Sequence, residues 1–230
     1  MNERRALLLS CGVALYAAAL PLTKAADIRP QSQDASLAAR LAPSALSPPL
    51  QDMKVRWDGA RTAQGGMKTF DSPRFGMTRN DGTRAHTGID LDAPVGTPIY
   101  AVADGLIELT RYGEAMLGTD VLLIFRPTPE LATYLRRIGS GDEDGVLFAN
   151  YAHLSAVYVE PGQRVTGGTL IGRTGATGNA DQKYPHLHFE IRKVRLPGVG
   201  AAGLRNRIDP ELLFRVDFAL PVEAATRRGN

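Results

Sequence analysis

Cysteine is almost absent from this chain of 230 residues. The single cysteine, Cys11, lies in an apolar segment close to the N-terminus. The rest of the chain cannot form a disulfide bridge, bind zinc through a thiolate or use a cysteine nucleophile. Its stability must come from a packed core, or from a core together with a bound metal ion, and a hydrophobic content of 43% is sufficient for such a core.

Long hydrophobic runs are also lacking, apart from one of 17 residues at Ala6–Leu22. It follows Arg4 and Arg5 and precedes the small-x-small sequence Thr23–Ala25, which together indicate a signal peptide over residues 1–25. We therefore expect export to the periplasm or cell envelope, with no stable membrane insertion after processing. A retained N-terminal anchor is the alternative, because the run is near the lower limit for a membrane span.

The excess of positive charge is small and belongs mainly to this leader. The whole chain has 27 basic and 24 acidic side chains, a net charge of +3. Residues 1–25 hold three of the basic and one of the acidic side chains, so the remainder carries 24 against 23, a net charge of +1. No basic stretch is interleaved with aromatic residues, and we expect no nucleic-acid partner.

Periodicity divides the remaining chain into three parts. Residues 26–60 are rich in Ala, Ser, Pro and Gln and show neither a helical nor a strand period, which predicts a flexible linker. Residues 61–220 are expected to form the folded domain, and residues 221–230 a tail. Short apolar runs punctuated by glycine predict a compact, mainly antiparallel β domain. An insertion at 127–146 interrupts this pattern with a predicted helix at 129–138.

Histidine is scarce, yet its placement is informative. In Pro185–Ile191, polar His186, His188 and Glu190 alternate strictly with apolar residues. Such alternation predicts a half-buried strand whose two imidazoles leave the same face about 7 Å apart at their Cα atoms. The apolar side would pack on the core, and the imidazole side would face a cleft or a metal site.

The other two histidines occur in comparable surroundings. His86 begins His86-Thr87-Gly88-Ile89-Asp90, where a bent strand or turn would bring His86 and Asp90 to one ion, and His153 ends a strand-like run. Imidazoles and one carboxylate are a normal zinc ligand set. The residues predict a metal site, but they do not decide whether His186 or His188 is a ligand, because both share one face.

Three protein ligands would leave the fourth zinc position for water, whose pKa zinc lowers toward ~7. One remaining histidine could accept a proton from that water, and the other, if protonated, could bind the developing oxyanion. The chain has no H-E-x-x-H sequence, so a glutamate base of the thermolysin kind is not expected. Glu190 is expected to support a ligand or to be solvated.

Three motifs in this order resemble the lysostaphin-type, or LytM-domain, zinc metallopeptidases. They are H-x-x-x-D at His86 and Asp90, Y-x-H-L at Tyr151, His153 and Leu154, and H-L-H-F-E at residues 186–190. The resemblance implies the LytM, or duplicated hybrid motif, fold with a groove. It implies one zinc ion per chain bound by His86, Asp90 and His188. It also implies that His153 and His186 act as catalytic residues.

The resemblance also implies a function. It points to an exported zinc metalloendopeptidase that hydrolyses peptide bonds in peptidoglycan stems or cross-links. The alternative is a non-catalytic LytM-like regulator of cell-wall amidases, against which the presence of all five site residues counts. Because the insertion at 127–146 directly precedes the His153 strand, we expect it to form a wall or lid of the groove.

Overall fold

The computed structural model describes residues 40–56, 72–80 and 82–219, apart from residues 114, 142–144, 181 and 183. The chain divides into the units Met1–Pro30 and Gln31–Asn230, and every described residue belongs to the second. The predicted signal peptide at 1–25 and the tail at 221–230 lie outside the described residues and remain predictions.

The fold is mainly β, as the sequence predicts. Its largest sheet has the strand order β11-β7-β8-β9-β13-β5-β2-β15, with β1 added beside β8 and β14 beside β13. A second sheet has the order β10-β12-β6, and β3 and β4 form a separate hairpin. The strands are β1 (Pro43–Ser44), β2 (Lys54–Arg56), β3 (Gly76–Arg79), β4 (Arg84–His86), β5 (Ile89–Asp92), β6 (Pro98–Tyr100), β7 (Gly105–Arg111), β8 (Asp120–Pro127), β9 (Leu147–Ala152), β10 (Leu154–Val157), β11 (Arg164–Val165), β12 (Leu170–Thr174), β13 (His186–Arg192), β14 (Arg207–Ile208) and β15 (Asp217–Ala219).

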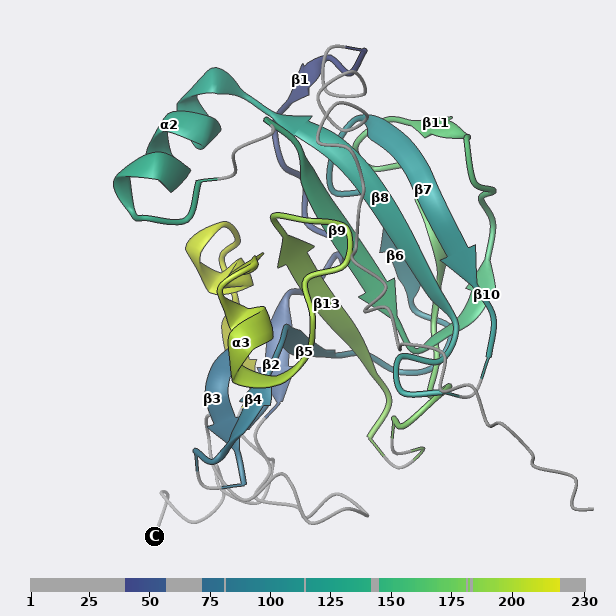
Figure 1. Cartoon of the computed structure of the whole chain (residues 1–230). Coiled ribbons are helices and arrows are strands. Elements are labelled where there is room, and N and C mark those ends of the chain that lie inside the picture. The colour runs from purple at the N-terminus through teal and green to yellow at the C-terminus, as the bar shows by residue number, and fades with distance from the viewer. Residues whose placement is uncertain are drawn as a thin grey trace, which may run out of the picture. The chain divides into compact units, whose positions relative to one another are not determined.

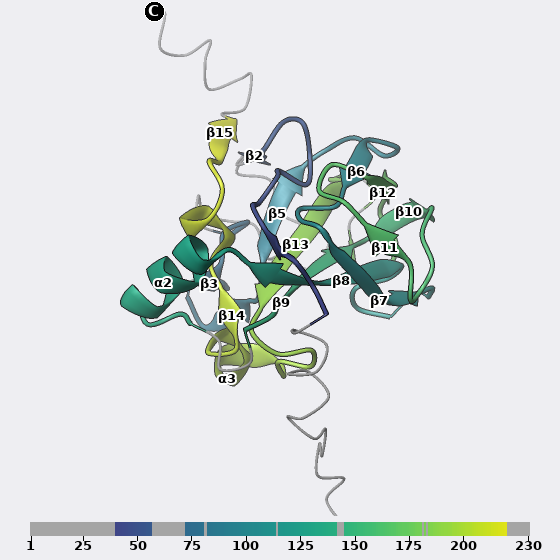
Figure 2. The same ribbon diagram turned by 90° about the horizontal axis from the view of Figure 1, so that it is seen from above.

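Within the described ranges, three short helical segments accompany the sheets. They are α2 (Pro129–Arg137), α3 (Gly200–Leu204) and the 3-10 helix η1 (Pro210–Leu212). Thr128 caps α2 by accepting a hydrogen bond from Leu131 N at 3.2 Å, and Pro129 occupies the first turn, where no backbone donor is needed. Figures 1 and 2 both show α2 and α3 on one side of the large sheet and β6 and β10 on the other, and Figure 2 shows β12 beside them.

The strand β13 lies in the middle of the large sheet and confirms the predicted alternation. Leu187, Phe189 and Ile191 are fully buried in the main core. The polar face is more enclosed than a half-buried strand implies, because His188 and Glu190 are also buried, with exposed fractions of 6% and 1%. Buried polar groups of this kind need partners, and they find them in one another.

Part of the predicted linker belongs to the folded domain. Residues 40–56 contain β1 and β2, and their buried apolar side chains include Leu41, Leu50, Met53 and Val55. Backbone bonds add to this packing, since Ser47 N donates to Val102 O and Tyr100 N to Pro49 O. The segment shows no period because it contributes isolated anchors and very short strands. The rest of residues 26–60 lies outside the described residues.

The insertion does not lie where we expected it. β8 and β9 are antiparallel, with Val121 opposite Tyr151 and Phe125 opposite Leu147. His153 follows the end of β9, whereas the insertion joins the other ends of these strands. The six residues of β9, at about 3.3 Å each, separate the two. The insertion therefore cannot be a wall beside His153. At the His153 end of the sheet, Arg111 of β7 pairs with Asp120 of β8, and His186 of β13 pairs with Asp92 of β5.

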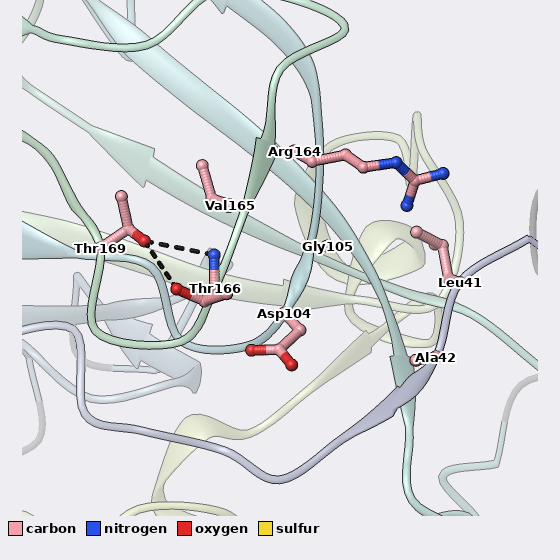
Figure 3. Close-up of a pocket in the computed structure, with 8 residues that line it drawn as sticks. All are labelled: Leu41, Ala42, Asp104, Gly105, Arg164, Val165, Thr166 and Thr169. Carbon is pink, nitrogen blue, oxygen red and sulfur yellow. Dashed lines mark hydrogen bonds between the residues drawn. The ribbon is translucent and has the colours of Figure 1, made fainter.

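A cavity of about 340 Å³ lies beside the start of β7 (Figure 3). Its lining residues are Leu41, Ala42, Asp104, Gly105, Arg164, Val165, Thr166 and Thr169, and none belongs to the predicted site. Gly105 pairs with Phe125, at the end of β8 away from His153. Within the described part of the chain, no helix combines the length and apolar character needed to cross a membrane.

Candidate metal centre

The register of three neighbouring strands brings the site together. His188 on β13 lies opposite Asp90 on β5 and, on its other side, opposite Ala152 on β9. His153 follows Ala152 directly. Residues far apart in the sequence therefore become neighbours because β13 lies between β5 and β9, as Figure 1 shows.

His86 joins this group from the β3–β4 hairpin. Its Nε2 lies 3.1 Å from Asp90 Oδ1 and 3.1 Å from His188 Nδ1, and His188 Nδ1 lies 2.9 Å from Asp90 Oδ1. All three side chains are buried. On its outer side, His86 Nδ1 donates to Arg74 O at 2.8 Å. A carbonyl oxygen only accepts, so this bond leaves Nε2 of a neutral His86 as the unprotonated nitrogen.

His188 presents the opposite ring nitrogen to the group. Its Nε2 donates to Glu190 Oε1 at 3.1 Å, while Nδ1 faces Asp90. Burial would lower the pKa of His188, but hydrogen bonds to Asp90 and Glu190 and the charges of both carboxylates outweigh burial and raise it to about 9. By contrast, burial and the charges of Arg79 and His188 lower the pKa of His86 to about 4, although Asp90 opposes this shift.

Asp90 is the centre of the charge distribution. Burial would raise its pKa, but His86, His186 and Arg79 together hold the pKa well below its usual value. Arg79 on β3 donates from Nη2 to Asp90 Oδ2. This contact occupies one carboxylate oxygen and leaves Oδ1 facing the imidazoles. Sequence reasoning missed Arg79, whose contact depends on how the hairpin folds over the sheet.

His153 is held by its backbone as well as by its ring. It adopts a left-handed conformation with φ of 64°, which is uncommon outside glycine, and its N–H donates to Leu117 O at 2.9 Å. Its Nδ1 donates to Thr177 O at 2.8 Å, so Nε2 is the free nitrogen. Burial and the neighbouring charges of His186 and His188 lower its pKa to about 3.

His186 completes the group and is its most exposed histidine. Its side chain is 16% exposed, and its Nε2 lies 3.6 Å from Asp90 Oδ1. Its ring lies 5.0 Å from that of His153, measured between centroids, and Nδ1 donates to Tyr184 O at 2.8 Å. Like His153, it presents Nε2 on the inner side. The structure thus gathers all five residues singled out in the sequence.

The inner group has the composition of a metal site. His86, Asp90 and His188 each offer one ligand atom, and these atoms lie close to one another. Two ligand atoms about 2.1 Å from a tetrahedral zinc ion would lie about 3.4 Å apart. The separations of 2.9–3.1 Å are within a few tenths of this value. The residues therefore fit a divalent ion with two nitrogen ligands and one oxygen ligand.

Comparison with known proteins agrees with the motifs. The family model described as "Peptidase family M23" matches residues 84–199, which are 116 of the 230 residues and include all five site residues. The chain belongs to peptidase family M23. The family resemblance inferred from the sequence is therefore confirmed.

Relatives of this M23 chain include two named endopeptidases. Peptidoglycan DD-endopeptidase ShyA of Vibrio cholerae is 34% identical over 106 residues, which are 46% of this chain and 20% of ShyA. Glycyl-glycine endopeptidase ALE-1 of Staphylococcus capitis is 35% identical over 108 residues, which are 46% of this chain and 24% of ALE-1. The M23 chain thus spans about a fifth to a quarter of the length of these relatives.

Among solved structures, the catalytic domain of lysostaphin from Staphylococcus simulans is similar to this chain. The match has a TM-score of 0.41 and 28% sequence identity, and it covers 58% of this chain and 80% of the lysostaphin chain.

Proposed function

We propose that this M23 domain is an exported zinc-dependent endopeptidase that hydrolyses peptide bonds in peptidoglycan stems or cross-links, in the periplasm or cell envelope. One observation carries the proposal. The imidazoles of His153 and His186 lie beside the three potential metal ligands, and each of these two imidazoles presents its Nε2 to the inner side of the site. A purely structural zinc site would need neither His153 nor His186. The names of ShyA and ALE-1 support an endopeptidase, and the name of ShyA supports peptidoglycan as the substrate.

His86, Asp90 and His188 would hold the zinc ion, one per chain. When bound, zinc supplies Lewis-acid polarisation of a carbonyl oxygen and lowers the pKa of water. Arg79 and Glu190 hold the outer atoms of Asp90 and His188, so that one ligand atom of each faces inward. Such outer hydrogen bonds fix the orientation and tautomer of metal ligands.

His153 is suited to accept a proton. Its Nδ1 donates to the Thr177 carbonyl, which fixes the neutral tautomer with an unprotonated Nε2 on the inner side. His186 is suited to contact the substrate because it is the most exposed of the four histidines. In its protonated form, it can donate from Nε2 to the oxygen that gains charge in the transition state.

The test is mass spectrometry of muropeptides before and after incubation with the full chain, together with its zinc content. We expect about one zinc per chain, new peptide products, and loss of these products with a chelator. Asp90→Asn should lose zinc and activity together. Asp217→Asn, the same change at an exposed carboxylate, should retain both. A zinc-loaded chain that leaves every muropeptide unchanged would refute the proposal.

A further inference from the structure

The segment Arg207–Glu211 reaches the candidate metal centre through two separate ion pairs. It comprises β14, which pairs with the end of β13, and the start of η1. It lies beyond residue 199, where the family match ends. One ion pair leads to Glu190, which bonds Nε2 of His188. The other leads to Arg74, whose backbone oxygen bonds Nδ1 of His86.

The first connection runs from Arg207 to His188. Arg207 Nε donates to Glu190 Oε2 at 3.1 Å, and Glu190 Oε1 accepts from His188 Nε2 at 3.1 Å. Arg207 is itself held in place, because its Nη1 donates to Gly198 O and Gly203 O at 3.0 and 2.9 Å. Its side chain is 6% exposed, and that of Glu190 is 1% exposed. The carboxylate therefore has little freedom to rotate away from His188.

The second connection runs from Glu211 to His86. Glu211 accepts two hydrogen bonds from Arg74, from Nε and from Nη2, both at 2.7 Å. This paired geometry fixes the direction of the guanidinium as well as its position. The backbone oxygen of the same residue, Arg74 O, accepts from His86 Nδ1 at 2.8 Å. Glu211 thus anchors the stretch of chain that sets the tautomer of His86.

We infer that Arg207 and Glu211 are positioning residues for the metal ligands His188 and His86, which makes the C-terminal segment part of the metal centre. The inference rests on the proposed function, because it assigns a purpose to groups that surround the proposed ligands. Groups that bond a ligating histidine directly typically change metal affinity by about 10- to 100-fold when removed, and Arg207 and Glu211 each hold one such group in place. Neither residue touches the reacting atoms.

A purely structural role would give a different pattern. The Arg74–Glu211 pair is partly exposed, with side-chain exposures of 34% and 16%, and pairs near a surface add little to stability. Its loss should hardly move the melting temperature of the metal-free protein. Glu190 keeps Arg192 and Thr87 as partners when Arg207 is replaced. Metal affinity should therefore respond more strongly than folding when Glu211 is replaced, whereas replacement of the buried Arg207 should lower both metal affinity and folding stability.

The experiment compares Arg207→Gln and Glu211→Gln with the wild-type full chain. Zinc affinity is measured by competition with a chromophoric chelator, and the visible spectrum of bound Co2+ reports the ligand geometry. The melting temperature of the metal-free protein reports folding. We expect each variant to bind zinc about three- to ten-fold more weakly, less than loss of a direct partner would cause, and to shift the Co2+ spectrum. The double variant should bind zinc more weakly than either single variant, because each connection supports a different imidazole.

Two matched variants serve as controls. Arg205→Gln makes the same change at an exposed arginine two residues from Arg207, and Asp217→Asn removes an exposed carboxylate. Both should stay within two-fold of the wild-type affinity. If Arg207→Gln fails to fold, Arg207→Lys and the partly exposed Glu211→Gln still decide the question. Folded Glu211→Gln with wild-type zinc affinity and Co2+ spectrum overturns the inference, and a wild-type chain without zinc overturns the proposed function as well.

Discussion

Gly88 occupies the one position between His86 and Asp90 where a side chain has no room. A Cβ atom there would lie 2.4 Å from Phe189 O, 2.9 Å from Glu190 Cγ and 3.0 Å from His188 Cε1. We expect Gly88→Ala to destabilise the domain and to weaken metal binding together, because β13 would have to move away from the His86–Asp90 connection.

The expected loss of stability depends on which atoms a Cβ at Gly88 would displace. Cβ contacts below 3.0 Å are essentially never seen, so the Phe189 carbonyl must retreat by at least 0.6 Å, the difference between 3.0 and 2.4 Å. That carbonyl belongs to a strand paired on both sides, with β5 and β9, which resists displacement. Overpacking of this kind costs about 1–3 kcal/mol, and rigid surroundings favour about 3 kcal/mol. Zinc affinity should fall at least ten-fold, since His188 and Glu190 move too.

Urea unfolding in the presence of a chelator measures the first effect, and chelator competition measures the second. Gly113→Ala is the matched control, because a Cβ at Gly113 meets no atom within 4 Å. Both changes reduce the entropy of the unfolded chain similarly, so their difference isolates the steric term. If Gly88→Ala unfolds at the same urea concentration as Gly113→Ala and binds zinc equally well, the packing argument is wrong.

Three further predictions concern single histidines and one buried hydroxyl. His153→Ala should keep its zinc yet release peptides from peptidoglycan at least ~100-fold more slowly, as expected for loss of a general base; substoichiometric zinc in this variant would contradict the assignment. Tyr151→Phe removes the acceptor of the buried Val102 N–H, which lies 2.9 Å away, and should cost about 1–3 kcal/mol in urea unfolding; an unchanged midpoint would contradict this. His188 has a pKa of about 9 in the folded, metal-free protein against 6.5 when unfolded, so its stabilisation is complete below pH 6.5 and is lost as the pH rises through 9. At about 1.4 kcal/mol for each pH unit, the difference between these two pKa values corresponds to about 3 kcal/mol in the free energy of unfolding. If metal-free His188→Gln loses the same stability as the pH rises from 6.5 to 9, the assignment is wrong.

Local patterns in the sequence were sufficient for the parts of the site that lie within one strand. Alternation predicts β13 and places His186 and His188 on one face, and the capping and turn residues around α2 predict that helix. Both patterns reflect contacts within a few residues. They leave open which strands pair, because β5 and β9 reach β13 from positions nearly a hundred and about forty residues away in the chain.

The groups around the site depend on such distant contacts, and sequence periodicity does not register them. Arg74 and Glu211 are separated by 137 positions, and His153 depends on the Thr177 carbonyl, 24 positions away. A backbone carbonyl is offered by any residue type, so the partner of His153 leaves no trace in composition. The sequence predicts a linker around Leu50 and Val55 for a similar reason, because single buried side chains in an irregular segment produce no period.

The choice between His186 and His188, which alternation leaves open, depends on the partner of the outer nitrogen. In His186, a backbone carbonyl holds Nδ1 and only Nε2 faces inward, 3.6 Å from Asp90 Oδ1. In His188, the Glu190 carboxylate holds Nε2, so Nδ1 faces inward at 2.9 Å from the same oxygen. A carboxylate increases the basicity of the opposite nitrogen more than a neutral carbonyl does, which favours His188 as the ligand. The glutamate two residues further along the same strand face is therefore the sequence feature that distinguishes the two histidines.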